Sequence, residues 1–510
     1  MRPRPASILS RLLALSLAAL CAGAAHAGEP APVAKHIILV IGDGMQADNE
    51  IAASRYLFGR DDGLSFHAFP YRGWVATWDV TVYNRRAPRL GLPPYNPSAI
   101  HPKAGCDAVP AGKSPAPPGR GRYTCSAPEG GGQGADSASA ATAWATGHKT
   151  DTGNVAWLPG DPDGGALTTI AELLRQKRGY SIGLVTTVPF SDATPAAHAS
   201  RSKSRRNRHA IADEIIRGVR PEVVIGGGHP ARSGDRFLSA SLYEDARAGR
   251  IGDYVFVERQ EGVDGGRSLK EAAARAVREK RKLFGLFGGE GGNFEPPVPS
   301  NDGTAVVKRA SIENPLLREA VLAALKVLSR NRNGFFLLVE QGDVDWANHA
   351  GDYGWMVGTM WDLDEAVRAV VDFVNRAGDD ITWADTLLIV TSDHATGAIR
   401  FDEARRLGKG RLPAQAPGLC PDRAAWCPGY PGGEVRYTST GHLNDPVPIY
   451  AMGDGALTRH LRQFQGGWYP CTPLIDNTHL FHAMTNAAGI PQPSPLRAVV
   501  TRPTVCPGGQ

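Results

Sequence analysis

The sequence predicts an α/β fold, a three-layer α/β/α sandwich around a mostly parallel central sheet with disulfide-stapled, loop-rich insertions. Short, nearly continuous apolar runs alternate with segments of helical periodicity, which is the pattern of strands that helices cover on both faces. The expected strands are His36–Ile41, Ser181–Thr186, Glu222–Ile225, Phe335–Val339, Thr386–Thr391 and Val447–Ala451. The expected helices between them are Leu167–Gln176, Ile211–Arg217, Pro315–Ser329 and Met356–Asn375.

Length and composition agree with one large globular domain. The chain has 510 residues, of which 42% are hydrophobic and 21% charged, and this balance excludes a disordered chain. The only long apolar run lies at the N-terminus, which excludes a protein with several membrane spans. We expect a single domain over residues 28–510, with Pro/Gly-rich insertions at about 80–135 and 398–440.

The first 27 residues have the pattern of a signal peptide. Arginines precede an apolar segment, Leu12–Ala25, that is too short to span a membrane comfortably, and Ala25–Ala27 forms a small-x-small cleavage site. We therefore expect a periplasmic or secreted protein with no stable membrane span after cleavage. An uncleaved anchor and a lipoprotein modified at Cys21 are the alternatives.

The charge balance says little about partners. Removal of residues 1–27 takes away three arginines and no acid, and lowers the formal net charge from +5 to +2. Basic residues do cluster at 201–208, but they are not interleaved with aromatic residues. The sequence therefore predicts no nucleic-acid-binding module.

Six cysteines remain once the signal peptide is removed. They permit 15 pairings, and an exported protein favours disulfides over free thiols. Their grouping along the chain suggests the pairs Cys106–Cys125, Cys420–Cys427 and Cys471–Cys506. The first two would staple the two insertions.

Acidic residues follow three of the expected strands. Asp43 comes after the first strand, Glu340 directly follows Phe335–Val339, and Asp393-His394 follow Thr386–Thr391. Ligands of open α/β sheets bind beyond the carboxyl ends of the strands. Any one of these acids alone could be a solvated loop residue. Gathered together they would repel one another unless cations bind, and the histidine favours zinc.

A second group of metal-ligand side chains lies further along the chain. If a helix begins near Asp345, then Asp345 and His349 occupy positions i and i+4 on one helical face and can share an ion. A surface Asp–His pair is the alternative. His442 precedes the strand Val447–Ala451 and could complete such a site.

Ser137 is a candidate nucleophile. It follows Asp136 at the start of a helix of small residues that ends near Gly147. The positive end of a helix holds phosphate and stabilises developing negative charge. The alternative is that both residues merely cap the helix. A Gly-x-Ser-x-Gly elbow is absent, which disfavours an esterase.

These segments resemble the alkaline phosphatase family, which comprises metal-dependent phosphomonoesterases. They occur in the family's order and span nearly the whole mature chain. The matching motifs are His36–Met45, Ala135–Thr150, Asp192–Pro195, Phe335–His349, Thr391–His394 and Gly441–His442.

The resemblance implies two zinc ions and one magnesium, with Ser137 as the residue that becomes phosphorylated. Its first zinc site would comprise Asp345, His349 and His442. Its second would comprise Asp43, Asp393 and His394, with Asp43 also bridging to magnesium. The magnesium would be held by Thr194, Glu340 and, through water, Asp192.

The phosphate-binding arginine follows from a count. The family places it eleven residues after the threonine, which is Arg205 here, and Asp136 would orient it. The loop before it departs from the family pattern, so Arg201, Arg206 and Arg208 remain alternatives. Trp346 is another departure: some members carry a lysine there, and a tryptophan would wall the pocket instead.

We therefore expect an exported alkaline phosphatase acting on small phosphorylated substrates. The resemblance also suggests a homodimer, because family members commonly form one. A phosphodiesterase or nucleotide hydrolase with the same metal site is one alternative. A phosphate- or metal-binding protein without turnover is another.

Overall fold

The core of the molecule is a ten-stranded, mostly parallel sheet. The computed structural model describes residues 33–110, 123–125, 134–376, 378, 380–419 and 426–499. The predicted signal peptide, residues 1–27, lies outside this part of the chain. In sheet order the strands are β20 (Leu474–Asp476), β2 (Tyr71–Ala76), β19 (Val447–Met452), β12 (Thr386–Thr391), β1 (His36–Gly42), β11 (Phe335–Gln341), β5 (Ser181–Pro189), β6 (Val223–Gly227), β8 (Lys282–Leu286) and β7 (Tyr254–Glu258).

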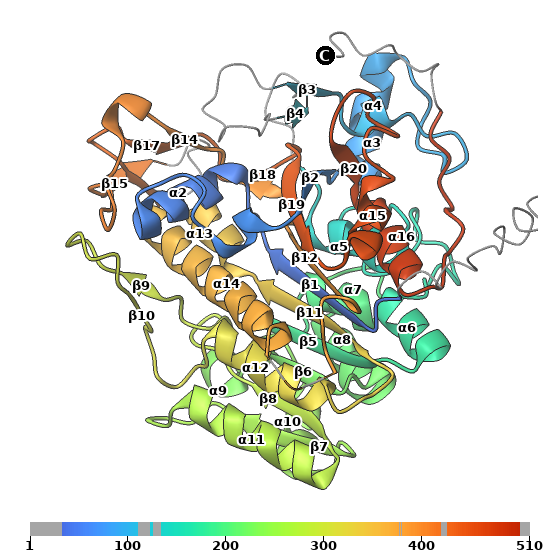
Figure 1. The fold of residues 1–510 in the computed structure, drawn as a ribbon, viewed down its shortest axis with the longest axis vertical. Coiled ribbons are helices and arrows are strands. Elements are labelled where there is room, and N and C mark those ends of the chain that lie inside the picture. The colour runs from blue at the N-terminus through green and yellow to red at the C-terminus, as the bar shows by residue number, and fades with distance from the viewer. Residues whose placement is uncertain are drawn as a thin grey trace, which may run out of the picture.

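Helices cover both faces of this sheet (Figure 1). Alternate side chains of β1 enter different cores: Ile37 and Leu39 pack on one face, and Ile38 and Val40 on the other. The first face is covered by α5 (Ser137–Thr146), α6 (Ile170–Arg178), α7 (Ala193–Ala199), α15 (Gly455–Arg462) and α16 (Asn477–Ala487). The second is covered by α2 (Ala47–Phe58), α11 (Gly265–Glu279), α12 (Leu317–Leu328), α13 (Asp343–Ala350) and α14 (Tyr353–Val374).

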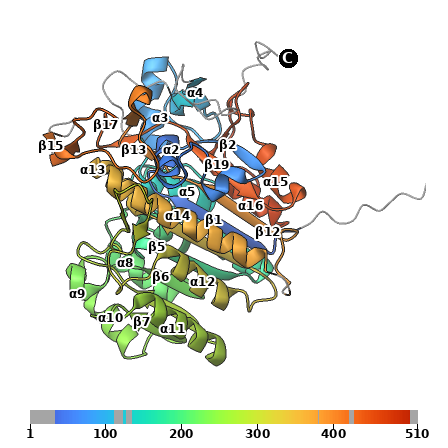
Figure 2. The ribbon, with the colours of Figure 1, turned by 60° about the vertical axis from the view of Figure 1, so that its left-hand side comes forward.

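The predicted α/β sandwich is confirmed. Figure 2 shows α14 and α12 along one side of the sheet and α15 and α16 on the other. Only β19 runs antiparallel to its neighbours, β12 and β2, within this sheet. All six predicted strands are present, and β5 and β11 extend further than expected.

Several elements were not predicted from the sequence, mainly strands toward the ends of the sheet. Strand β20 has only three residues, and the apolar runs of β2 and β8 are interrupted by Arg72-Gly73 and by Gly285. Strand β7 does contain an apolar run, Tyr254–Val257, which was not predicted as a strand. The expected helix Ile211–Arg217 is divided into α8 (Arg208–Asp213) and a π-helical segment, Glu214–Val219.

The region of the first insertion packs around its own small core. It includes α3 (Val80–Arg86), α4 (Pro102–Gly105) and the hairpin of β3 (Ala108–Pro110) with β4 (Tyr123–Cys125). The predicted disulfide Cys106–Cys125 is confirmed, with its Cα atoms 4.9 Å apart. Trp78 and Tyr83 pack in the same cluster.

The second insertion contributes two small antiparallel sheets of two strands each. They pair β14 (Ile399–Phe401) with β17 (Val435–Tyr437), and β15 (Ala416–Leu419) with β16 (Trp426–Gly429). Cys420, and with it the predicted pair Cys420–Cys427, lies outside the described residues. Cys471 is disulfide-bonded, and its predicted partner, Cys506, is likewise outside them.

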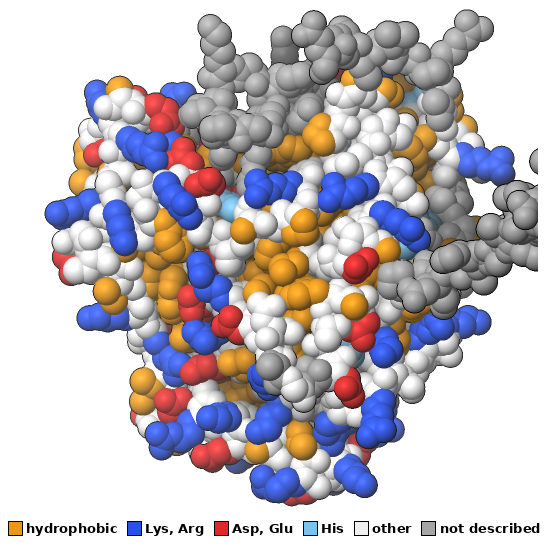
Figure 3. Space-filling view, in the orientation of Figure 1, with side chains coloured by type: hydrophobic (Ala, Val, Ile, Leu, Met, Phe, Trp, Pro, Cys, Tyr) orange, Lys and Arg blue, Asp and Glu red, His pale blue; other side chains and the backbone are white. Residues whose placement is uncertain are grey.

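Charges of both signs are interspersed on the surface seen in Figure 3. Among the residues described, no helix is both long and apolar enough to cross a membrane.

The order of the strands positions the candidate site. β12, β1 and β11 are parallel neighbours, and Ile41 pairs with both Thr391 and Glu340. The segments that leave these strands therefore emerge at the same edge of the sheet. This edge carries the acids that the sequence places after the strands.

Candidate active site and metal centre

A cavity of about 280 Å³ opens at the carboxyl edge of the sheet. Three of the predicted site residues do not line it. Asp136 and His394 contact the lining residues Arg205 and Ser137, and Asp393 contacts His394 behind them. The predicted residues that line the cavity are Asp43, Ser137, Asp192, Thr194, Arg205, Glu340, Asp345, His349 and His442. The structure thus brings together residues that are up to 399 positions apart in the chain.

Asp345, His349 and His442 form the first cluster. Asp345 and His349 lie one turn apart on α13, with His349 Nε2 at 3.1 Å from Asp345 Oδ2. His442 Nε2 lies 3.1 Å from His349 Nε2 and 3.6 Å from Asp345 Oδ1. The other ring nitrogens, Nδ1 of each histidine, donate to the backbone carbonyls of Thr440 and Ala135. In the neutral rings this tautomer leaves both Nε2 atoms unprotonated, which is the form that binds a cation.

Asp43, Asp393 and His394 form the second cluster. His394 Nε2 lies 3.1 Å from Asp393 Oδ2 and 3.6 Å from Asp43 Oδ1. The backbone N–H of Gly44 donates to Asp393 Oδ1 at 2.9 Å. The stacked rings of His394 and His442, with centroids 3.6 Å apart, join the two clusters.

Thr396 links the clusters a second time. Its hydroxyl donates to Asp345 Oδ1 at 2.6 Å and therefore accepts a hydrogen bond from His394 Nδ1 at 3.1 Å. In its neutral form His394 thus also presents an unprotonated Nε2. The sequence analysis missed Thr396 and the carbonyls of Ala135 and Thr440. No residue type or spacing marks these groups, because their role arises from contacts across the fold.

A third group of oxygens lies beside the second cluster. Glu340 is the penultimate residue of β11 and accepts a hydrogen bond from Thr186 at 2.5 Å, while Thr194 lies in the first turn of α7. Within the described part of the chain, Asp43 Oδ1, Asp393 Oδ2 and Thr194 Oγ1 are buried without a hydrogen-bond partner. Unpaired buried oxygens are costly. Bound cations would remove that cost, so the donor set fits metal ions.

The electrostatics of the clusters point the same way. Burial raises the pKa of Asp43 well above its ordinary value, and the charges of Asp393 and Asp345 raise it further. Burial also raises the pKa of Glu340, to about 8. Burial by itself would lower the pKa of His349, but its hydrogen bond to Asp345 raises it to about 9. The carboxylates therefore need positive charge beside them to be ionised together.

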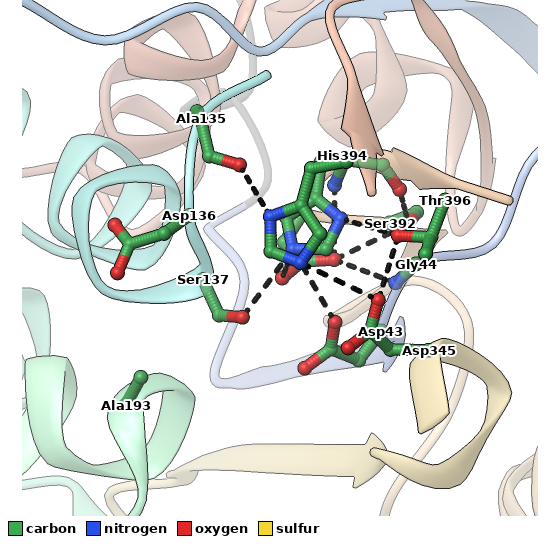
Figure 4. Close-up of polar contacts among 12 residues, drawn as sticks. Asp43, Gly44, Ala135, Asp136, Ser137, Ala193, Asp345, Ser392, His394 and Thr396 are labelled. Carbon is green, nitrogen blue, oxygen red and sulfur yellow. Dashed lines mark hydrogen bonds and ion pairs between the residues drawn. The ribbon is translucent and has the colours of Figure 1, made fainter. Parts of the chain in front are cut away.

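Ser137 begins helix α5 and faces the second cluster. Its side chain is 3% exposed, and its Oγ lies 3.3 Å from His394 Nε2 (Figure 4). Asp136 is the N-cap of the same helix and accepts from the N–H of Ser139 at 3.0 Å. The Asp136 carboxylate points away from the imidazoles in Figure 4. The serine hydroxyl thus lies at the positive end of a helix, beside the metal-ligand side chains.

Arg205 is the arginine of the basic loop that lines the cavity. It donates to Asp136 Oδ2 at 3.1 Å and to Asp192 Oδ1 at 3.0 Å. Arg201 is instead bound to Glu172 and Glu214. Geometry therefore favours Arg205 among the four arginines that the sequence left open. Trp346 lines the same cavity and is 48% exposed.

The fold and the cavity define a class: an α/β enzyme whose cavity joins a serine at the start of a helix to clustered side chains of metal-ligand type. The alkaline phosphatase family model matches residues 131–414, more than half of the chain. The chain belongs to the alkaline phosphatase family. The predicted family and its enzyme class, phosphomonoester hydrolase, are confirmed at this level.

Similar proteins agree with this assignment. Alkaline phosphatase 3 of Bacillus subtilis is 32% identical over 51% of this chain and 49% of its own length, so that match covers about half of each protein. Streptomycin-6-phosphate phosphatase of Streptomyces griseus is 29% identical over 96% of this chain and 97% of its own. The crystal structure of Thermus thermophilus alkaline phosphatase shares the fold, with a TM-score of 0.56 and 22% identity over 92% of this chain and 95% of that chain.

Proposed function

We propose that this chain is an exported, metal-dependent hydrolase of phosphate monoesters that acts through a phosphoserine on Ser137. The observation that carries the proposal is the position of the Ser137 hydroxyl. It lies at the start of α5, 3.3 Å from His394, in a cavity shared by both carboxylate–imidazole clusters and Arg205. The similarity to a streptomycin-6-phosphate phosphatase over nearly the whole of both chains supports a small phosphate monoester as the substrate.

The two clusters are the proposed zinc sites. Asp345, His349 and His442 would hold one zinc ion, and Asp43, Asp393 and His394 would hold the second. Asp192, Thr194 and Glu340, together with Asp43, would hold one magnesium ion, whose preference for oxygen ligands they satisfy. When bound, such ions supply positive charge to the attacking and leaving oxygens of an in-line displacement and lower the pKa of a hydroxyl.

The chain's own residues then carry out the steps. The Arg205 guanidinium grips two phosphate oxygens, and Asp136 and Asp192 fix its plane. Ser137 Oγ attacks phosphorus and loses its proton to solvent, and the bond from phosphorus to the ester oxygen breaks. The departing alkoxide takes up a proton. Water then attacks the phosphoserine, which releases phosphate and restores the serine.

Location and assembly complete the proposal. A periplasmic or secreted location rests on the signal-peptide pattern of residues 1–27. A homodimer rests on the resemblance to the family. Gel filtration of the mature protein, combined with light scattering, tests whether it is a homodimer.

Replacement of Ser137 tests the reaction itself. We expect Ser137→Ala to lower the release of phosphate from 4-nitrophenyl phosphate by roughly 10³-fold or more, because the nucleophile is lost. The wild type should give a phosphoserine label after acid quench, and the variant should give none while keeping its zinc and magnesium content. Ser54→Ala, a buried serine in α2 outside the cavity, is the control.

Three results would refute the proposal. They are a variant as active as the wild type, a wild type that turns over without a trapped phosphoserine, and a wild type that hydrolyses bis(4-nitrophenyl) phosphate faster than the monoester. The last would favour a phosphodiesterase.

A further inference from the structure

Asp79 is a buried carboxylate just outside the cavity. It is 0% exposed and precedes α3. Its two oxygens have different partners. Oδ1 accepts the N–H of Val82 at 2.7 Å, which caps α3, whereas Oδ2 accepts the hydroxyls of Ser139 at 2.8 Å and Thr152 at 2.7 Å. The cap accounts for only one of these oxygens.

Both segments anchored by Oδ2 of Asp79 also bind Asp136. Ser139 donates its N–H to Asp136 Oδ1 at 3.0 Å, and its Oγ lies 2.9 Å from the same oxygen. Gly153, the residue after Thr152, donates its N–H to this oxygen at 3.0 Å. Asp136 Oδ1 is thus held by the two segments that Asp79 ties together.

The same two segments reach Arg205. With Oδ1 of Asp136 engaged, Oδ2 is left to accept the Arg205 guanidinium at 3.1 Å. The carbonyl of Gly153 accepts the backbone N–H of Arg205 at 2.8 Å. Asp79 therefore connects to both the side chain and the backbone of the arginine without touching it.

We propose that Asp79 is a positioning residue for Arg205, acting through Ser139, the Thr152–Gly153 segment and Asp136. The inference rests on the proposed function, in which Arg205 binds the phosphoryl group. Burial raises the pKa of Asp79 to about 6, so at alkaline pH it is ionised and accepts both hydroxyls. The carboxylate then fixes the rotamer of Ser139 and the turn at Gly153, and these fix Asp136.

Two variants separate this role from simple capping. Asp79→Ser retains a side chain that caps α3 but is too short to reach Ser139. Ser139→Ala removes the connecting hydroxyl. For both we expect the inhibition constant of inorganic phosphate and the KM for 4-nitrophenyl phosphate to rise about tenfold, the cost of a misplaced charge-assisted contact. Metal content should be unchanged.

Thr146→Val is the matched control. Thr146 is buried in the same helix, and its hydroxyl donates to the carbonyl of Thr142 at 2.7 Å, away from Asp136. Thr146→Val should lower Tm about as much as Ser139→Ala does, with no change in the inhibition constant of phosphate. Ser139→Thr restores a hydroxyl and should restore most of the phosphate affinity. Equal effects of Thr146→Val and Ser139→Ala would overturn the proposal.

A double-mutant cycle with Arg205→Ala gives the decisive measurement. If Ser139 acts through Arg205, its replacement should have almost no further effect on phosphate inhibition once Arg205 is absent. An undiminished tenfold effect in the Arg205→Ala background would refute the positioning role. Failure of the proposed function would look different, because the wild type itself would then lack phosphatase activity and phosphoserine.

Discussion

Two buried aspartates of the site, Asp43 and Asp345, have pKa values that move in opposite directions. Burial acts to raise both values. For Asp345 the hydrogen bond to His349 and the charge of His442 outweigh burial and hold the pKa well below its ordinary value. Asp43 has the acids Asp393 and Asp345 as neighbours, and its pKa rises. Of these two carboxylates, Asp43 is therefore the one whose ionisation depends more on a bound cation.

At the residue scale the choice of arginine can be tested directly. Arg205→Ala should raise the KM for a phosphate monoester and the inhibition constant of phosphate by roughly 30-fold or more, since a bidentate, charge-assisted contact is worth ~2–3 kcal/mol. Arg206→Ala is the control, because Arg206 is an exposed neighbour that does not line the cavity. Steady-state kinetics measure both. A larger effect for Arg206→Ala would show that Arg206, and not Arg205, binds phosphate.

At the scale of elements, the loop after β1 and the helix α13 are in direct contact. Gly44 has φ +70°, a conformation that favours glycine, and a Cβ atom there would lie 2.7 Å from Asp345 Cα. The same residue donates its N–H to Asp393 Oδ1. One glycine thus sets the separation of residues from both clusters.

Gly44→Ala should therefore damage the site through its backbone. The left-handed φ costs about 1 kcal/mol, and the collision with α13 should bring the loss of unfolding free energy to ~3 kcal/mol or more. Bound zinc should fall with it. Gly160→Ala is the matched control: its φ is +76° and nothing lies within 4 Å of a Cβ there. Chemical denaturation and elemental analysis check both, and equal losses in the two variants would show that the contact is unimportant.

Another connection between elements runs through Asp362 of α14. It accepts the N–H of Leu317 at the start of α12 at 3.1 Å and the Gln341 amide of β11 at 2.9 Å. Burial raises the pKa of Asp362 from 3.8 to about 7, while the Leu317 hydrogen bond acts to lower it. The folded state therefore favours the protonated acid.

This shift predicts a pH dependence of stability. The contribution of Asp362 is complete below the ordinary pKa and is lost as pH rises toward 7, by an amount of the order of a few kcal/mol. Asp362→Asn should flatten the decline in unfolding free energy between pH 4 and 7, measured by denaturant titration. Asp372→Asn, an exposed acid on the same helix, should not. A decline that is unchanged in Asp362→Asn would contradict the assignment.

At the scale of the whole molecule, the proposed cations join segments that are distant in the chain. The ligands come from the ends of β1, β11 and β12, from α7 and α13, and from β18 (His442–Leu443). A ligand that binds only the folded chain stabilises it by mass action. The metal centre should therefore act as a cross-link between the central strands.

Removal of metal should then lower both activity and stability. We expect a strong chelator to abolish phosphate release and to lower Tm by about 5 °C or more. A cation whose free concentration is far above its Kd contributes ~4 kcal/mol to the free energy of unfolding, and the chelator removes that contribution. Zinc and magnesium together should restore both values, measured by calorimetry and kinetics. Asp345→Asn should show a smaller chelator-induced shift in Tm. Full activity in the chelated protein would rule out the metal-dependent reaction.

The site illustrates how far local patterns reach. The pairing of Asp345 with His349 follows from helical spacing, and Asp136 at the start of α5 follows from capping preference, because both depend on residues within one turn. The acids after β1, β11 and β12 were predictable because parallel strands end at one edge. Strand β8 lacks a comparable local signal, because Gly285 interrupts its apolar run.

By itself the sequence determined the α/β fold, the family and the set of acids and histidines expected at one edge of the sheet. Only the tertiary structure decided that Arg205 lines the cavity while Arg201 pairs with Glu172 and Glu214, and that Asp79 and Ser139 stand behind Asp136. The reason is the distance along the chain over which each effect acts. Periodicity and capping act over a few residues, whereas the direction of a loop side chain depends on packing between segments far apart in the chain.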